Sequence, residues 1–112
     1  MNADVLVRAL DHYGDNVILR RLTGTQRVPF DVPCRAAVSV GAAQALVGGV
    51  QITADRILMS SREIQAAGWP GMPHHGDQVI YDDSRTFVVQ GRANPFPLDD
   101  GDFLIQLTVL GG

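Results

Sequence analysis

The sequence predicts a mainly β protein, a small antiparallel β-barrel or sandwich with an N-terminal helix and one short inserted helix. Three observations predict this fold: six strand-like segments, short turns between them, and a chain of only 112 residues. A chain of this length forms one domain with a small core. Short strands separated by turns are typical of barrels and sandwiches. We therefore expect a single domain over residues 1–112, with the barrel over residues 16–111.

The first expected element is a helix over residues 2–13. Apolar side chains recur there at three- and four-residue spacing, which places them on one face: Val5, Leu6, Ala9, Leu10 and Tyr13. Asn2 suits the N-cap, and Gly14 suits the left-handed position that ends a helix. This short amphipathic helix has to pack against another surface.

Strands are expected over residues 16–22, 28–40, 51–60, 78–82, 86–90 and 103–110. Thr23-Gly24-Thr25 makes the first turn, and Asp83-Ser84 makes a tight hairpin. Pro29 and Pro33 interrupt the second segment. Because proline lacks the N–H that a central strand needs, that segment is expected to be an edge strand or a bulged one. The last segment, 103–110, carries the strongest strand signal.

A short helix is expected over residues 61–67, between the third and fourth strands. Ser60 stands three residues before Glu63, which is the capping-box spacing at a helix start. Ile64 and Ala67 give the segment an apolar side, and Gly68 can stop it.

Two segments are expected to be loops. Residues 41–50 are small, uncharged and glycine-rich, with no clear periodicity, so we expect a flexible loop that is mobile or functional. Its residues are Gly41, Ala42, Ala43, Gln44, Ala45, Leu46, Val47, Gly48, Gly49 and Val50. Residues 68–76 are rich in proline and glycine and carry the only tryptophan, Trp69. Trp69 is either an exposed contact anchor or a ring folded back over the end of the barrel.

Charge and composition exclude some classes of function. The net charge is −3 and the sequence pI is near 5.4, which argues against nucleic acid as the main partner, because that needs a basic face. No apolar run approaches the ~20 residues that span a bilayer, and no signal peptide is visible, so no membrane association is expected. Cys34 is the single cysteine, which excludes an internal disulfide and fits a reducing cytoplasm.

The residues with reactive side chains form no site in the sequence. His74 and His75 lie near Asp77, but adjacent histidines on a strand point to opposite faces, and no second Cys or His cluster completes a tetrahedral site. Cys34 lies in a proline-flanked strand with no motif beside it, so a buried small residue is expected. We therefore expect no metal site and no cysteine nucleophile.

The acidic pairs and the glycines also predict no site. Asp82-Asp83 and residues 99–102 fall at expected turns, where aspartate bonds to nearby backbone, and they match neither a catalytic acid–base pair nor a calcium loop. The glycines of residues 41–50 lack the Lys-Ser/Thr and the helix of a phosphate-binding loop. The chain is therefore expected to have no catalytic residues and no cofactor, and not to be an enzyme.

The order of elements in the second half resembles a known family. A strand at residues 56–59 leads into the capped helix, Gly76-Asp77 opens a hairpin, an aromatic-valine strand follows at 86–92, and an acidic-glycine turn at 99–102 precedes the last strand. This order is similar to that of the lambda-type head–tail joining proteins of tailed bacteriophages, also called head completion or stopper proteins. The resemblance covers residues 55–111, and the chain departs from it by a longer insertion at 68–75.

The resemblance implies a structural virion protein without enzymatic activity, made in the host bacterial cytoplasm and located at the head–tail interface. It would form a ring around the DNA channel, with portal or connector proteins on one side and tail proteins on the other, and would contact passing DNA weakly at most. Residues 41–50 would be the channel or assembly loop. Gly76 and Asp77 would be the family-like motif, and the candidate interface residues are Trp69, Asp99, Asp100 and Asp102.

Two alternatives remain open. One is a tail terminator or minor tail protein, because these also use small β-rich folds and rings. The other is a small β-barrel module that binds a nucleotide, sugar or oligonucleotide. Against the second stand the acidic net charge and the small number of stacking surfaces, since the chain has two Tyr, four Phe and one Trp.

Overall fold

The computed structural model describes Val5, residues 8–10, His12, and residues 14–81, 85–99 and 101–111. Within the helix expected over residues 2–13, the described residues are helical, and Leu10 is buried. Gly14 donates its backbone N–H to the Leu10 carbonyl at 2.8 Å. The hairpin turn expected at Asp83-Ser84 lies outside the described residues.

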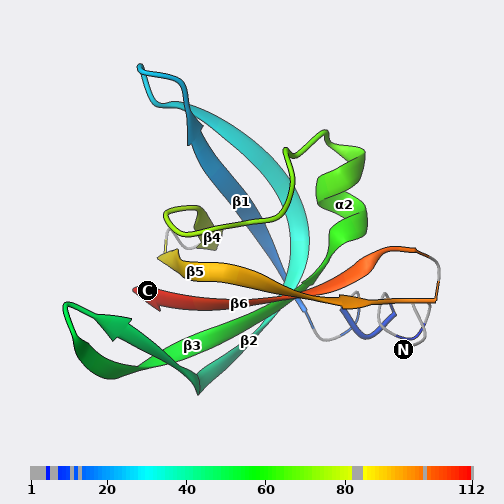
Figure 1. Ribbon diagram of the computed structural model, residues 1–112. Coiled ribbons are helices and arrows are strands. Elements are labelled where there is room, and N and C mark those ends of the chain that lie inside the picture. Colours follow the sequence, from blue (N-terminus) through cyan, green and yellow to red (C-terminus); the bar gives the residue numbers. More distant parts are fainter. Residues whose placement is uncertain are drawn as a thin grey trace.

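Six antiparallel strands close into a barrel in the order β1-β2-β3-β6-β5-β4 (Figure 1). The elements are β1 (Asp15–Thr23), β2 (Val28–Val47), β3 (Val50–Ser60), α2 (Ser61–Ala66), β4 (Gln78–Tyr81), β5 (Thr86–Pro97) and β6 (Phe103–Gly111). The mainly β fold with a short inserted helix is therefore confirmed.

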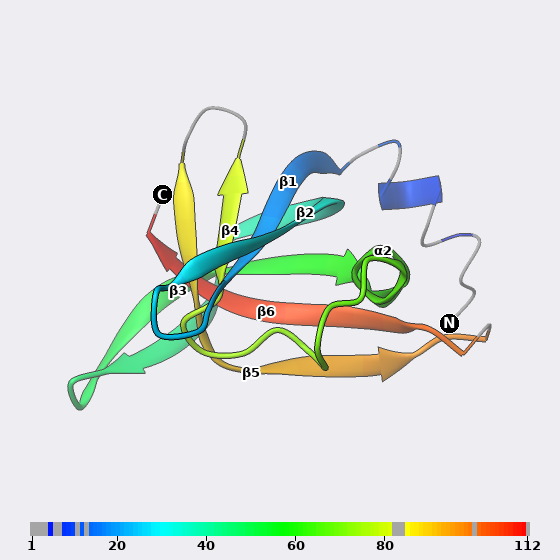
Figure 2. The same cartoon turned by 90° about the horizontal axis from the view of Figure 1, so that it is seen from above.

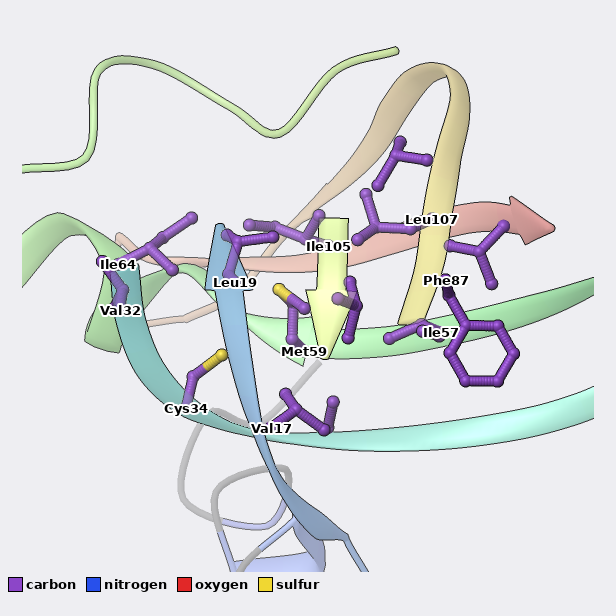
Figure 3. Packing of buried hydrophobic residues seen from close by; sticks show 14 of the residues in the cluster. Val17, Leu19, Val32, Cys34, Ile57, Met59, Ile64, Phe87, Ile105 and Leu107 are labelled. Atoms are coloured by element: carbon purple, nitrogen blue, oxygen red, sulfur yellow. The ribbon is translucent and has the colours of Figure 1, made fainter. Parts of the chain in front are cut away.

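The core fills the barrel with the inward-facing residues of every strand. Leu19 on β1, Ile57 and Met59 on β3, and Ile105 and Leu107 on β6 have no exposed surface (Figure 3). Alternate residues of a strand point to opposite faces, so each strand supplies every second side chain to this cluster. A closed barrel of this size is filled by its own side chains.

The prolines of β2 lie where that strand has one neighbour. β2 pairs with β1 from Val28 to Ala36 and with β3 from Ala36 to Val47, so Pro29 and Pro33 fall in the half that pairs with β1 alone. The Arg35 N–H, at the same parity as both prolines, points away from β1 and donates to the Glu63 carboxylate at 3.2 Å. Proline nitrogens at these positions therefore cost no ladder bond. The expected edge character is confirmed for this half of β2.

The expectation of a loop over residues 41–50 is wrong. β2 and β3 run through this segment as a hairpin, and the turn is made by Gly48 and Gly49 with φ of 56° and 81°. Alanine has little intrinsic preference for strands, but cross-strand pairing overrides it here. The signal for this hairpin is the Gly-Gly pair between Val47 and Val50, because two glycines supply the positive φ of a tight β-turn.

α2 has the expected start and stop. The Ser60 hydroxyl accepts from the Arg62 N–H at 3.2 Å, so Ser60 is the N-cap. At the other end Gly68, with φ of 80°, donates to the Gln65 carbonyl, and the next residue donates to the Ile64 carbonyl, which together form a Schellman motif. The Glu63 carboxylate does not close a capping box, because it accepts from β2 instead.

Candidate functional site

The segment expected to be a flexible loop is a projecting hairpin. We call residues 40–54 the arm: it is the last part of β2 paired with the first part of β3, and it extends beyond the barrel (Figures 1 and 2). At its base the register shifts, so that residues 40–42 of β2 face the single residue Asp55 of β3. The Asp55 carboxylate accepts from the Gly41 N–H at 2.9 Å, and Gly41 has φ of 69°. This bulge bends the arm outward.

One face of the arm is apolar along its whole length. Cross-strand partners share a face, and here Ala43 pairs with Ala54 and Ala45 with Ile52. The three alanines at the base are buried and pack with Leu110 of β6. Further out this cover ends, because Ile52 is 37% exposed and Val50, next to the turn, is 62% exposed. The apolar face is therefore covered only near the barrel.

The other face of the arm, over its paired residues 43–54, is polar with one exception. It carries two cross-strand pairs, Gln44 with Thr53 and Leu46 with Gln51, and the Gln51 amide donates to the Gln44 carbonyl oxygen. Leu46 lies on this face with 74% of its surface exposed. None of residues 41–54 is charged. The arm thus presents exposed aliphatic side chains near its tip and no charge.

A cleft of about 310 Å³ separates the arm from the barrel. It lies beside a second bulge, where residues 91–93 of β5 face the single residue Leu107 of β6 and Gly91 has φ of 72°. The Gly91 N–H donates to the His75 ring at 3.4 Å. The lining residues are Gln44, Ala45, Leu46, His75, Gln90, Gly91 and Thr108.

An apolar depression of about 290 Å³ lies on the outer face of β1, β2 and β4. Ile18 at its centre pairs with Pro33 of β2 on one side and Ile80 of β4 on the other. Asn16, Val17 and Tyr81 complete the lining. Next to it the Arg20 guanidinium forms two hydrogen bonds to the Asp31 carboxylate, at 2.7 and 2.8 Å. That guanidinium lowers the pKa of Asp31, and none of the described residues that line the depression is charged.

A third cavity, of about 330 Å³, occupies one mouth of the barrel. Val40 and Arg85 are two of its lining residues. The others come one from each of the six strands, and they are Asp15, Val38, Asp55, Tyr81, Phe87 and Gly111. The Arg85 guanidinium stacks on the Tyr81 ring, 4.8 Å from its centroid. Barrel mouths are common places for ligand sites. This one combines apolar walls with two carboxylates.

The family-like motif Gly76-Asp77 forms a buried ion pair. Asp77 is 2% exposed, and its carboxylate accepts from the Arg21 guanidinium twice, at 3.0 and 2.8 Å. Arg21 also donates to the carbonyls of Pro70 and Met72, at 2.9 and 3.1 Å. We call this set of contacts the clamp, because it ties the segment between α2 and β4 to β1.

Trp69 belongs to the clamp. Its ring is 5% exposed, lies 4.7 Å from the Arg21 guanidinium and meets the Phe30 ring edge-to-face at 5.7 Å. Of the two interpretations of Trp69, the ring folded back on the barrel is the one that the structure shows. An exposed contact anchor at this position is therefore wrong.

The acidic turn lies apart from the arm. Asp99 is exposed, and the half-buried Asp102 pairs with Arg62 of α2 at 3.2 Å. Asp100 lies outside the described residues. The β5–β6 connection and the arm lie at opposite ends of the molecule in both views (Figures 1 and 2). The structure therefore brings Trp69 and Asp77 together around Arg21 and leaves the acidic turn separate from the arm.

Cys34 and the histidines have structural surroundings. Cys34 is buried as expected, and burial, together with the nearby Glu63 carboxylate, raises the pKa of its thiol to about 12. The His74 backbone N–H donates to Asp77 at 2.9 Å, and His75 accepts from Gly91. Among the residues that the structure describes, no three His, Cys, Asp or Glu side chains gather as a metal ion would require.

Arg21 is the residue that no sequence motif points to. Its position in the alternating pattern of β1 could have identified it, because Arg21 is the next inward-facing residue after Val17 and Leu19. An arginine at the end of an apolar face is expected to find a carboxylate, since burying an unpaired charge is costly. In the described ranges no helix is long and apolar enough to cross a membrane. Neither the family models nor the curated proteins include a match to this chain.

Proposed function

We propose that this chain is a structural assembly protein of a tailed bacteriophage, which joins the DNA-filled head to the tail as one subunit of a ring around the DNA channel. The observation that carries the proposal is the arm. A small barrel that extends an uncharged hairpin with Leu46 and Val50 exposed at 74% and 62% leaves apolar surface that another protein can cover.

The order of elements supports the same class of protein. The similarity to head–tail joining proteins rests on the capped helix, the Gly-Asp motif and the acidic-glycine turn, and each has a structural task here. Ser60 caps α2, Asp77 holds Arg21, and Asp102 pairs with Arg62. These three motifs stabilise the fold, as expected of a structural protein.

The candidate reactive groups also support a scaffold. The Cys34 thiol is buried, and its pKa of about 12 keeps it protonated near neutral pH, which is the opposite of an activated nucleophile. Both oxygens of the Asp77 carboxylate accept from the Arg21 guanidinium, and one also accepts from the His74 backbone N–H. The partners in this proposal are portal or connector proteins, tail proteins and further copies of this chain.

A joining assay tests the proposal. Filled heads and free tails from particles lacking this gene are mixed with the purified protein and examined by electron microscopy and infectivity. We expect the wild-type protein to join them and Leu46→Asp to reduce joining at least tenfold. Val28→Asp is the matched control, because Val28 is 54% exposed but lies at the tip of the β1–β2 hairpin.

The other outcomes decide between the remaining candidates. A protein that caps tail tubes and leaves heads separate would be a tail terminator, and the joining role would fail. Binding to neither heads nor tails would refute the phage assignment. A ligand screen against the barrel-mouth cavity would then be the next experiment.

A further inference from the structure

We propose that the tip of the arm docks into the depression around Ile18, Pro33 and Ile80 on a neighbouring copy of this chain. The proposal rests on the proposed function in one respect, since a ring subunit must contact a neighbour on each side. It assigns the arm to the contact between copies and not to the lining of the DNA channel.

The arm has apolar surface that its own chain leaves uncovered. One face of its base is covered, because Ala43, Ala45 and Ala54 are buried against Leu110, whereas Val40 at the start of the arm is 84% exposed. Its tip lies beyond the barrel in both views (Figures 1 and 2). Leu46 and Val50 flank the turn there, on opposite faces and largely exposed. A hairpin whose projecting tip carries exposed aliphatic side chains can insert into a second molecule.

The depression has matching chemistry. Its walls are aliphatic, from Ile18, Pro33 and Ile80, and its volume of about 290 Å³ has room for branched aliphatic side chains. On one side of the depression Arg20 and Asp31 neutralise each other as a bidentate pair. On the other side the Arg35 guanidinium donates to the side-chain oxygen of Asn16 at 3.0 Å. The described residues of the walls carry no charge, so a charged side chain placed against them would lose hydration. Residues 41–54 of the arm carry no charged side chain, so the arm can cover these walls without desolvating a charge.

The two surfaces lie on different parts of the barrel. The arm grows from β2 and β3, whereas the depression is centred on β1 and β4, which lie across the ring of strands from β3 and β6. One copy can therefore donate its arm to a second while receiving the arm of a third. Such a head-to-tail contact generates a ring when the rotation closes. A two-fold contact of arm with arm would stop at a dimer.

Crosslinking between single-cysteine variants tests the contact. Val50→Cys places a thiol on the arm and Pro33→Cys places one in the depression. Both positions are exposed in the monomer, so both variants are expected to fold, which circular dichroism checks. The native Cys34 is buried and its thiol stays protonated, so it does not compete for a bismaleimide reagent. We expect the mixed variants, at high concentration, to give at least tenfold more crosslinked dimer than either variant alone.

The controls make the contact specific. Val28→Cys, equally accessible on the other hairpin, should give no crosslink with Pro33→Cys. Val50→Arg and Pro33→Asp should each weaken self-association in sedimentation velocity, and mixing or combining them should restore it by forming a new ion pair. Equal crosslinking of Val50→Cys with itself would establish an arm-to-arm contact and overturn the proposal. So would the absence of any crosslink in the mixture.

The same proteins separate this proposal from the joining function. If wild-type protein joins heads to tails but the cysteine pair gives no crosslink, the docking proposal fails and the joining function stands. If the pair crosslinks but heads and tails stay apart, the docking stands and the joining function fails.

Discussion

The clamp and the arm are two segments that lie outside the barrel, and different interactions fix each of them. In the clamp, Arg21 contacts both Asp77 and Trp69 at close range; Asp77 and Trp69 are almost entirely buried, and the Arg21 side chain is 13% exposed. In the arm, backbone pairing fixes the two strands, while Leu46 and Val50 stay exposed. Groups that find partners within the chain stabilise the monomer. Apolar groups left exposed are available to a second molecule.

The largest expected effect breaks the clamp. Asp77→Asn leaves the Arg21 guanidinium, 13% exposed in its side chain, without its counter-charge. Removing one partner of a buried ion pair costs about 3–5 kcal/mol. Urea unfolding should therefore show a loss of that size. Leu46→Ser in the arm is the matching change, and it should alter the unfolding free energy by less than about 0.5 kcal/mol. Similar losses for both variants would remove the distinction between the two regions.

The second effect concerns the core between these regions. Cys34→Ser places a hydroxyl at a buried position, which costs about 1–3 kcal/mol when the hydroxyl lacks a partner. Burial raises the thiol's pKa to about 12, above its value in the unfolded chain. The thiol's contribution to stability is thus complete below the unfolded pKa and is lost as the pH rises toward 12.

Thiol labelling at pH 8 measures the same burial directly. The wild-type thiol should react only through opening of the barrel, so Asp77→Asn should accelerate labelling and Leu46→Ser should not. Fast labelling of the wild-type protein would contradict the buried position of Cys34.

The strands, the short helix and the buried cysteine follow from the sequence because they depend on local patterns. Alternation predicts β1 and β6, and the serine before Glu63 predicts the N-cap of α2. The arm and the clamp depend on contacts between distant segments. Nothing near Asp77 indicates that Arg21, 56 residues earlier, is its partner. The alanines of the arm carry no alternation of polarity, so its pairing is visible only through the Gly-Gly turn.

The third effect acts on the base of the arm. Gly41 has φ of 69°, and a Cβ there would meet only the Thr53 methyl at 3.7 Å, an ordinary contact. The cost of Gly41→Ala is therefore conformational, about 1–2 kcal/mol for a left-handed backbone. Gly41→Asn should cost less, because asparagine tolerates this region. Thermal unfolding of the two variants measures the difference. Equal costs would show that the bulge does not hold the left-handed conformation.

The smallest effect compares two ion pairs on adjacent residues of β1. Arg20–Asp31 has the same bidentate geometry as Arg21–Asp77, but its side chains are 33% and 35% exposed. Exposed pairs contribute about 0–1 kcal/mol, so Asp31→Asn should cost far less than Asp77→Asn. Arg20 lowers the pKa of Asp31. The contribution of this pair is thus present above the unfolded aspartate pKa and is lost as the pH falls through the lower, folded value.

Denaturation of wild-type and Asp31→Asn protein across an acid pH series checks this sign. Their difference in unfolding free energy should stay constant above about pH 5 and vanish in strong acid. Added salt should reduce it as well, because exposed charges are screened. A loss at Asp31 as large as that at Asp77 would mean that the charge pair itself, and not its burial, determines how firmly each segment is held. The contrast between the clamp and the exposed surface would then have a different cause.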